Sequence, residues 1–225
     1  AYQSHASQHI DSVIPRVKVS SQWNFEKDTH LGQHDIIHTL EPRIQYTYAP
    51  FDEQSQIKNF DTTYSIFNYD QVYRLNRFAG HDRIINANQL SLGLESRIIS
   101  AKTGKEVWMG AIGQVLHFSE RRVPLCTMST VNGSCEDSPA LLGFTSQDAR
   151  WSPLSIRSRF SATSSMAIVG DYVWDPASNA TNNANVSMHY ALADGHLLNG
   201  GYSYLINGDA SYSANNFVNN KALHQ

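Results

Sequence analysis

Apolar and polar side chains alternate with a period of two along much of the chain, which is typical of β-strands with one apolar face. Between residues 154 and 162, Leu154, Ile156 and Phe160 fall on one face, and serine and arginine side chains fall between them. The segment 184–192 alternates in the same way. Such strands place one face against an apolar medium and the other against water.

The same alternation predicts eight strands of about ten residues each. Their ranges are 16–25, 40–48, 89–99, 107–118, 154–162, 166–174, 184–192 and 196–206. A tilted strand of this length is long enough to cross a bilayer. We therefore predict an all-β fold, an antiparallel transmembrane β-barrel of which about eight strands are present.

Connector lengths alternate between short and long, and this pattern distinguishes a barrel from a soluble β-sandwich. The short connectors are 101–105, 163–165 and 193–195, and the long ones are 49–87, 119–153 and 175–183. Outer-membrane barrels combine short periplasmic turns with long extracellular loops. Sandwich strands also alternate in polarity, but that fold does not place every long loop at one end. The pattern favours the barrel.

Charged side chains are concentrated on the polar faces of the predicted strands. They are Arg16, Lys18, Glu41, Arg43, Glu95, Arg97, Arg157 and Arg159. A charge on the lipid side costs about 2–4 kcal/mol near the bilayer midplane, so we predict that these side chains line a wet lumen. On an ordinary antiparallel sheet they would form the solvent-exposed face.

Pro42 lies inside the predicted strand 40–48 and cannot donate a ladder hydrogen bond. It marks either a tolerated bulge or a weakened pairing through which lipid leaves. We favour the bulge.

Composition mainly excludes other classes of protein. The net charge is −3 over 225 residues, so nothing indicates a nucleic-acid partner. No apolar run approaches the roughly 18 residues of a membrane helix. The first residues, AYQSHASQHI, lack the basic and apolar regions of a signal peptide, so we expect a mature chain or a fragment.

No local motif for catalysis or for a cofactor is present, neither G-x-S-x-G nor a P-loop nor a dinucleotide fingerprint. We predict a non-catalytic protein without a cofactor; an outer-membrane hydrolase barrel is the enzymatic alternative. The histidines are scattered, and on a strand His34 and His38 do not form a helical ligand pair, so no metal site is predicted. Cys126 and Cys135 form either a local disulfide or two unpaired thiols in a loop.

Two segments carry motifs that go beyond strand rhythm. Residues 39–51 read TLEPRIQYTYAPF, and residues 77–89 read RFAGHDRIINANQ. The first is similar to the TLEPR-x-QY-x-Y-x-P-Y/F segment of the LptD family of lipopolysaccharide-assembly proteins, and the second to its R-x-x-G-x-DR-x-x-x-ANQ segment. The resemblance is collinear from residue 12 to 99, whereas after Arg121 only the strand rhythm continues.

The resemblance implies a lipopolysaccharide translocon in the outer membrane of a Gram-negative bacterium. The family's barrel has about 26 strands, holds the plug lipoprotein LptE, and connects to periplasmic bridge proteins through an N-terminal domain. We therefore expect residues 1–225 to be a partial barrel domain and an internal fragment. The two cysteines do not match the family's paired arrangement. A general porin or adhesin-type outer-membrane barrel is the alternative function.

The long connector 49–87 is predicted to be the functional centre of the chain. It is too long for a bare hairpin turn. It is also rich in aromatic residues, and so much apolar surface has to pack against the barrel wall, a plug protein or lipid. The candidates for contact with the plug or with the saccharide head group are Tyr64, Tyr69, Tyr73, Arg74, Arg77, Asp82 and Arg83.

Overall fold

A computed structural model describes residues 12–54, 57, 59–125, 149–192, 196–205 and 223–224. Their strands are β1 (Val17–Gln22), β2 (Phe25–Leu31), β3 (His34–Ala49), β4 (Thr63–Tyr64), β5 (Phe78–Ala79), β6 (Ala87–Ser100), β7 (Glu106–His117), β8 (Leu154–Ser161), β9 (Met166–Asp175), β10 (Ala180–Ala191), β11 (Leu197–Leu205) and β12 (Leu223–His224). A short 3-10 helix, η1 (Tyr69–Tyr73), interrupts them. None of the described helical residues forms a segment that is long and apolar enough to span a bilayer.

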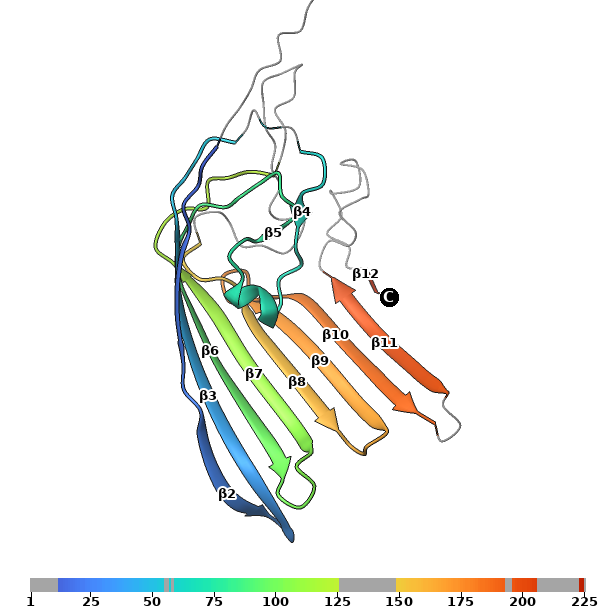
Figure 1. Cartoon of the computed structure of the whole chain (residues 1–225). Coiled ribbons are helices and arrows are strands. Elements are labelled where there is room, and N and C mark those ends of the chain that lie inside the picture. Colours follow the sequence, from blue (N-terminus) through green and yellow to red (C-terminus); the bar gives the residue numbers. More distant parts are fainter. Residues whose placement is uncertain are drawn as a thin grey trace, which may run out of the picture.

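The strands form one antiparallel sheet in which neighbours in sequence are neighbours in space (Figure 1). The strand order is β1-β3-β6-β7-β8-β9-β10-β11-β12, with β2 also paired to β3, and β4 and β5 form a separate small pair. The all-β, antiparallel prediction is confirmed. The long strands run side by side as a meander, which is how a barrel wall is built.

The predicted first strand, 16–25, ends at Gln22 as β1, and β2 (Phe25–Leu31), which the alternation did not predict, follows it end to end along β3. Residues 43–48 of β3 pair with β1, and residues 34–40 pair with β2. At the break, the Pro42 carbonyl accepts a hydrogen bond from the Trp23 N–H at 3.1 Å, but proline has no N–H to return. The other side of β3 is unaffected, since Pro42 stays in register with Leu94 of β6. Pro42 therefore behaves as the tolerated irregularity that the sequence favours.

Two connectors differ from the prediction. The strand predicted at 40–48 begins at His34, after a tight turn in which Gly32 has a φ of 63°. Glycine reaches positive φ without steric cost, and this allows a two-residue hairpin loop. The long connector predicted at 175–183 is wrong: β9 ends at Asp175, β10 begins at Ala180, and a four-residue turn joins them. The predicted turn at 193–195 lies outside the described residues.

The sheet has an apolar and a polar face, and the register keeps them apart. We call the face that carries Gln45, Ser91 and Arg157 the inner face, because η1 lies against it. On the opposite, outer face, many cross-strand partners are both apolar or aromatic, as for Ile156 with Ile112 and with Tyr172, although Leu92 faces Gln114. Exposed outer-face side chains include Tyr46, Leu92, Leu94, Ile112, Ile156, Phe160, Tyr172, Val186, Tyr190 and Leu198.

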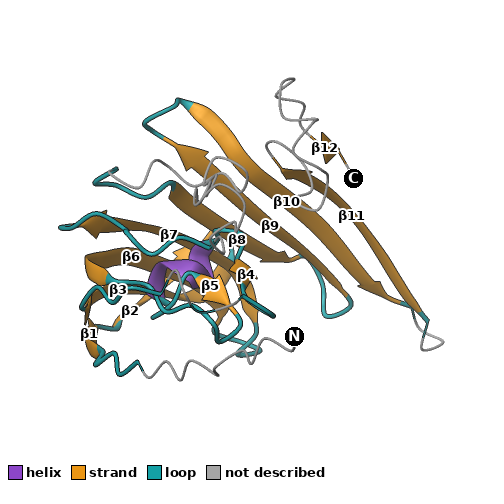
Figure 2. Cartoon of the chain, turned by 90° about the horizontal axis from the view of Figure 1, so that it is seen from above, coloured by secondary structure: helices purple, strands orange, loops and turns teal. Residues whose placement is uncertain are grey.

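The sheet curves, and the segment between β3 and β6 lies in the hollow of the curve (Figure 2). We call this segment, residues 50–86, the inner loop. Its helix packs on the sheet through a buried cluster of Phe67, Tyr69, Val72 and Tyr73 with Ala111, Val115 and Val173. A second buried cluster joins Tyr64, Phe78, Ile85 and Val123 to Ala49 and Ala87. Much of the apolar surface of the inner loop is thus packed against the sheet itself, whereas Phe60 and Ile66 stay exposed.

Two glycines make room for this packing. Gly93 of β6 and Gly113 of β7 are direct cross-strand partners on the inner face. A Cβ added at Gly93 would overlap the hydroxyl of Tyr73, and one at Gly113 would lie 3.1 Å from the Tyr69 ring. The glycine pair is therefore a notch that receives the two tyrosines.

Substitution of Gly93 should loosen the inner loop. We expect Gly93→Ala, in the intact protein, to displace Tyr73 and to lower the free energy of unfolding by about 1–3 kcal/mol. Trypsin should then cut faster after Arg74, an exposed residue at the end of η1. Gly200→Ala on β11 is the control, because an added Cβ there meets no atom within 4 Å. Equal cleavage rates and equal unfolding temperatures in the two variants would show that the packing of Tyr73 does not depend on a glycine at position 93.

Candidate functional site

The candidate site is the inner face of the sheet together with the inner loop that covers part of it. Helix η1 begins after Asn68, whose side-chain oxygen accepts a hydrogen bond from the Gln71 N–H at 3.1 Å. Asparagine is among the preferred residues at this capping position, so the local sequence encodes the helix start. The helix thereby places Asp70 and the two buried tyrosines toward the sheet.

Polar side chains of the inner face hold the main chain of the inner loop. The Tyr73 carbonyl accepts hydrogen bonds from Gln45 Nε2 at 3.1 Å and from Lys18 Nζ at 3.4 Å. The Val72 carbonyl accepts one from Ser91 Oγ at 2.5 Å. Carbonyls at the end of a helix lack helical partners, so these side chains satisfy groups that would otherwise be buried and unpaired.

The two tyrosines of η1 sit in the most enclosed part of the site. Their rings meet edge to face with centroids 5.7 Å apart, and the Arg43 guanidinium lies 4.0 Å from the Tyr73 ring centroid. Burial is the main cause that raises the pKa of Tyr69 and of Tyr73 above the ordinary tyrosine value. Both phenols therefore stay neutral, and Arg43 contacts Tyr73 through the ring face.

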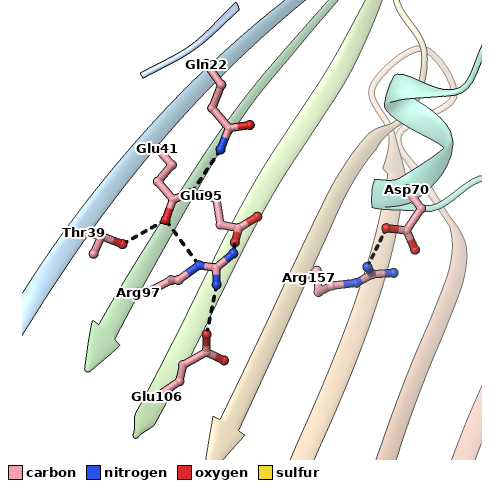
Figure 3. Close-up of polar contacts among 8 residues, drawn as sticks. All are labelled: Gln22, Thr39, Glu41, Asp70, Glu95, Arg97, Glu106 and Arg157. Atoms are coloured by element: carbon pink, nitrogen blue, oxygen red, sulfur yellow. Dashed lines mark hydrogen bonds and ion pairs between the residues drawn. The ribbon is translucent and has the colours of Figure 1, made fainter. Parts of the chain in front are cut away.

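Nearer the short-turn end, Arg97 is surrounded by carboxylates from three strands (Figure 3). It forms ion pairs with Glu41 at 3.3 Å, with Glu106 at 3.4 Å, and with Glu95. Gln22 donates to Glu41 at 3.1 Å and joins β1 to the same network. The structure thus brings together Glu41, Glu95 and Arg97 from the predicted polar faces and adds Glu106.

A second arginine ties the helix to the sheet. Arg157 of β8 pairs with Asp171 of β9 at 2.6 Å. It also pairs with Asp70 of η1 at 2.9 Å (Figure 3). One guanidinium carries enough donors to bind two carboxylates in one plane. Asp70 was not singled out from the sequence, because nothing in its local pattern shows that it would reach a strand 87 residues away.

The other predicted polar-face residues have no such network. Arg159 is exposed on the inner face of β8, and Arg16 is exposed just before β1. Lys18 and Arg43 contact the inner loop as described above.

Most of the loop residues singled out from the sequence hold the inner loop together. Tyr64 packs on Phe78 with ring centroids 5.0 Å apart. Arg77 donates to the Val123 carbonyl at 2.7 Å, and the fully buried Arg83 donates to the Ile57 carbonyl at 2.6 Å. Burial lowers the pKa of Arg83. Arg74, in contrast, is exposed.

Asp82 closes the turn near the tip of the loop. Its carboxylate accepts hydrogen bonds from the N–H groups of Phe60 at 2.6 Å and Asp61 at 2.9 Å. The bond from the Asp61 N–H is the largest cause that lowers the pKa of Asp82, followed by that from the Phe60 N–H.

Cys126 and Cys135 lie outside the described residues. In the part of the chain that the structure describes, no cluster of three or more metal-binding side chains occurs.

A curved antiparallel meander with an apolar outer face and a polar, loop-covered inner face is the wall of a β-barrel. The model of one protein family, described as LPS transport system D, matches residues 1–224. The chain belongs to this family, LptD, as the motifs at 39–51 and 77–89 indicate.

Curated relatives agree with this assignment, and each is named LPS-assembly protein LptD. The chain is 45% identical to the protein of Legionella pneumophila (strain Paris) over 212 residues, 94% of this chain and 25% of the relative. It is 35% identical to that of Pseudomonas aeruginosa (strain LESB58), with 86% of this chain and 21% of the relative covered. For Coxiella burnetii (strain RSA 493 / Nine Mile phase I) the identity is 31%, over 84% and 20%. The chain thus spans about a quarter of the length of these relatives. The porin or adhesin alternative is not favoured.

Acid should loosen the tip of the inner loop through Asp82. A carboxyl whose pKa is lowered by folding stabilises the fold fully above the unfolded value of about 3.9, and this contribution is lost as the pH falls through the folded value. We expect hydrogen exchange at the Phe60 and Asp61 amides to be slow at pH 6, after correction for the intrinsic rate, and faster at a second pH that is low enough to protonate Asp82 in the folded protein.

In the Asp82→Asn variant, the Phe60 and Asp61 amides should exchange faster than in the wild-type protein already at pH 6. Their exchange should also lose most of its pH dependence. Asp28→Asn on β2 serves as the control. Protection of the two amides that is the same in the wild-type protein at both pH values would contradict this role of Asp82.

Proposed function

We propose that this chain is part of the wall of an outer-membrane translocon that carries lipopolysaccharide to the cell surface in a Gram-negative bacterium, without catalysing a reaction. The supporting observation is the two-faced sheet, which separates an apolar outer surface from a polar interior. Membership of the LptD family, whose curated members are named LPS-assembly proteins, supports the choice of substrate.

The outer face suits contact with hydrocarbon. Side chains such as Leu92, Ile112 and Val186 are exposed there although they are apolar. A continuous apolar surface of this kind would be a liability in water. Within a bilayer, it meets acyl chains, and the backbone groups of each strand are satisfied by the neighbouring strands.

The inner face suits contact with a hydrated head group. Around β3 to β8 it carries the charged networks of Arg97 and Arg157. On β10 and β11 it carries amide, hydroxyl and imidazole groups, as in the hydrogen bonds of Asn185 with Ser203 at 2.6 Å and of His189 with Asn199 at 2.9 Å. Such a surface keeps water and saccharide in the interior, and the polar substrate is screened from lipid.

Partners follow from the same proposal. An LptE-like plug lipoprotein would fill the remaining interior and meet the exposed surface of the inner loop, where Arg74 lies. Periplasmic bridge proteins would deliver lipopolysaccharide through a domain that precedes the barrel. Tyr64, Tyr69, Tyr73, Arg77 and Arg83 would serve this function indirectly, by fixing the loop that the plug and substrate meet.

A matched pair of arginine substitutions tests the two faces. Val186 is on the outer face of β10, and its neighbour Ser187 is on the inner face. We expect Val186→Arg in the intact protein to destabilise the folded barrel by about 2–4 kcal/mol and to reduce its heat-modifiable folded form on gels. Ser187→Arg should leave the folded form at the wild-type level. Equal loss of the folded form in both variants would contradict the assignment of the faces. Loss only in Ser187→Arg would reverse it.

Photocrosslinking in cells tests the transport function. A photoreactive amino acid at His189 would face the interior, whereas one at Tyr190 would face lipid. We expect lipopolysaccharide to crosslink at position 189 only while newly made lipopolysaccharide is supplied, because the interior is a route of passage. Crosslinks at position 190 should persist after the supply stops. A crosslink at position 189 that never forms, or that persists without supply, would argue against transport along this face.

A further inference from the structure

One short part of the inner loop reaches strands across most of the sheet, from β1 to β10. We call this part, residues 67–73, the crossbar. Its contacts follow the strand order: its first residue bonds to β10, its middle residues contact β8 and β7, and its last residues contact β6, β3 and β1. The crossbar therefore runs across the strands, in the hollow of the sheet (Figure 2).

Both ends of the crossbar are held by side chains of the inner face. At one end, the Phe67 carbonyl accepts a hydrogen bond from Asn183 Nδ2 of β10 at 3.0 Å. At the other end, the Tyr73 carbonyl accepts hydrogen bonds from Gln45 of β3 at 3.1 Å and from Lys18 of β1 at 3.4 Å. Asn183 and Gln45 are buried, so a broken bond at either end leaves polar groups without water to replace it.

The middle of the crossbar is held as well. Asp70 pairs with Arg157 of β8 at 2.9 Å, and the Val72 carbonyl accepts a hydrogen bond from Ser91 of β6. The two tyrosines lie in the notch at Gly93 and Gly113. The crossbar is thus attached to the wall along its whole length.

An irregularity in β10 directs Asn183 toward the crossbar. The register with β9 shifts between Thr181 and Asn183, so β10 carries one residue more than its partner there. Such a bulge bends the strand and turns a side chain to a new direction. Consecutive residues of a regular strand point to opposite faces, but Asn182 and Asn183 are both buried, and the Asn183 amide also donates to Asn182 Oδ1 at 3.0 Å.

The crossbar is much shorter than the stretch of sheet that it crosses. In a flat sheet, the strands from β1 to β10 in the order of the sheet would span roughly 29 Å. The main chain of residues 67–73 is only about 15 Å long, because most of it is 3-10 helix with a small rise per residue. The outermost strands come within reach because the sheet bends toward the crossbar (Figure 2).

From this geometry we propose that the crossbar is a tie that sets the curvature of the barrel wall between β1 and β10. Ladder hydrogen bonds join each strand only to its neighbours. The crossbar joins strands on the two flanks of the hollow. The wall cannot flatten here unless the bond to Asn183, or the bonds to Gln45 and Lys18, break.

The inference deepens the proposed function and rests on it for its meaning in transport. The curvature of the wall decides how much of the inner face beside the loop is open, and on β10 and β11 this is the polar surface that a saccharide head group would meet. A tie of fixed length keeps that opening constant while substrate passes.

Two pairs of spin labels in the intact, detergent-purified protein measure the curvature. Labels are attached through an unnatural amino acid, so that the cysteines stay unchanged. One pair, at Ser20 and Ser187, is on the inner face of β1 and β10, and the other, at the neighbouring Val19 and Val186, is on the outer face. When a curved sheet flattens, labels on the inner face move apart and labels on the outer face move together. Pulsed electron paramagnetic resonance reports both distances.

Asn183→Ala cuts the tie at β10. We expect the inner pair to move apart by up to about 5 Å, one strand spacing, and the outer pair to move closer. Asn185→Ala is the matched control: it removes a hydrogen bond of 2.6 Å to Ser203 from the same strand and face, but not one to the crossbar, and both distances should stay at the wild-type values.

Asp70→Asn is a second cut, at an exposed side chain that the fold of the sheet does not need. It weakens the attachment to β8 and should change both distances in the same directions by a smaller amount. The heat-modifiable form on gels shows which variants are folded.

Wild-type distances in the folded cut variants overturn the tie. So does a change in which both pairs move apart, since that is a general loosening and not a loss of curvature. A change of the same size in the control also overturns it. If the supply-dependent crosslink at position 189 forms while the cut variants keep the wild-type distances, only this inference fails and the proposed function stands.

Discussion

The structure depends on strand register, because register alone keeps the two faces of the sheet different. A slip of one residue would move every charged side chain of a strand to the outer face. From β3 to β6 the register runs unbroken over fourteen pairs, even past Pro42. The register shifts at Ile98 and at Thr181 are near strand ends. The break beside Pro42 is on the side of β3 that pairs with β1 and β2. The middle of each strand, where contact with lipid would be closest, is regular.

The inner loop depends on that register in turn. Its contacts come from side chains on at least five strands, namely Lys18, Gln45, Ser91, Arg157 and Asn183. These side chains reach the loop only because the register places all of them on the inner face in neighbouring cross-strand rows. The notch at Gly93 and Gly113 exists only while the two glycines remain partners. The loop is therefore bound by the assembled sheet and not by any single strand.

The sequence was sufficient for most of the long strands and their faces, because a period of two is a local signal that each strand repeats, but it missed β2 and the first residues of β3. It was not sufficient for the inner loop. Tyr69 and Tyr73 look like surface aromatics until Gly93 and Gly113, far along the chain, are placed opposite each other. The pairing of Asp70 with Arg157 is equally non-local. The error at 175–183 has a different cause. The alternation of polar and apolar residues weakens in 180–183, where Asn182 and Asn183 are both buried, so the sequence predicted a strand from residue 184 and not from Ala180.

The distribution of charge on the inner face also bears on how a transport route can work. A route must admit an anionic substrate without holding it, so strong sites along it have to be few. Arg97 and Arg157 satisfy this condition because three carboxylates already pair with the first and two with the second, and an incoming anion would have to compete with these. Beyond them, β10 and β11 present amides, hydroxyls and a histidine, which form exchangeable hydrogen bonds with water or sugar.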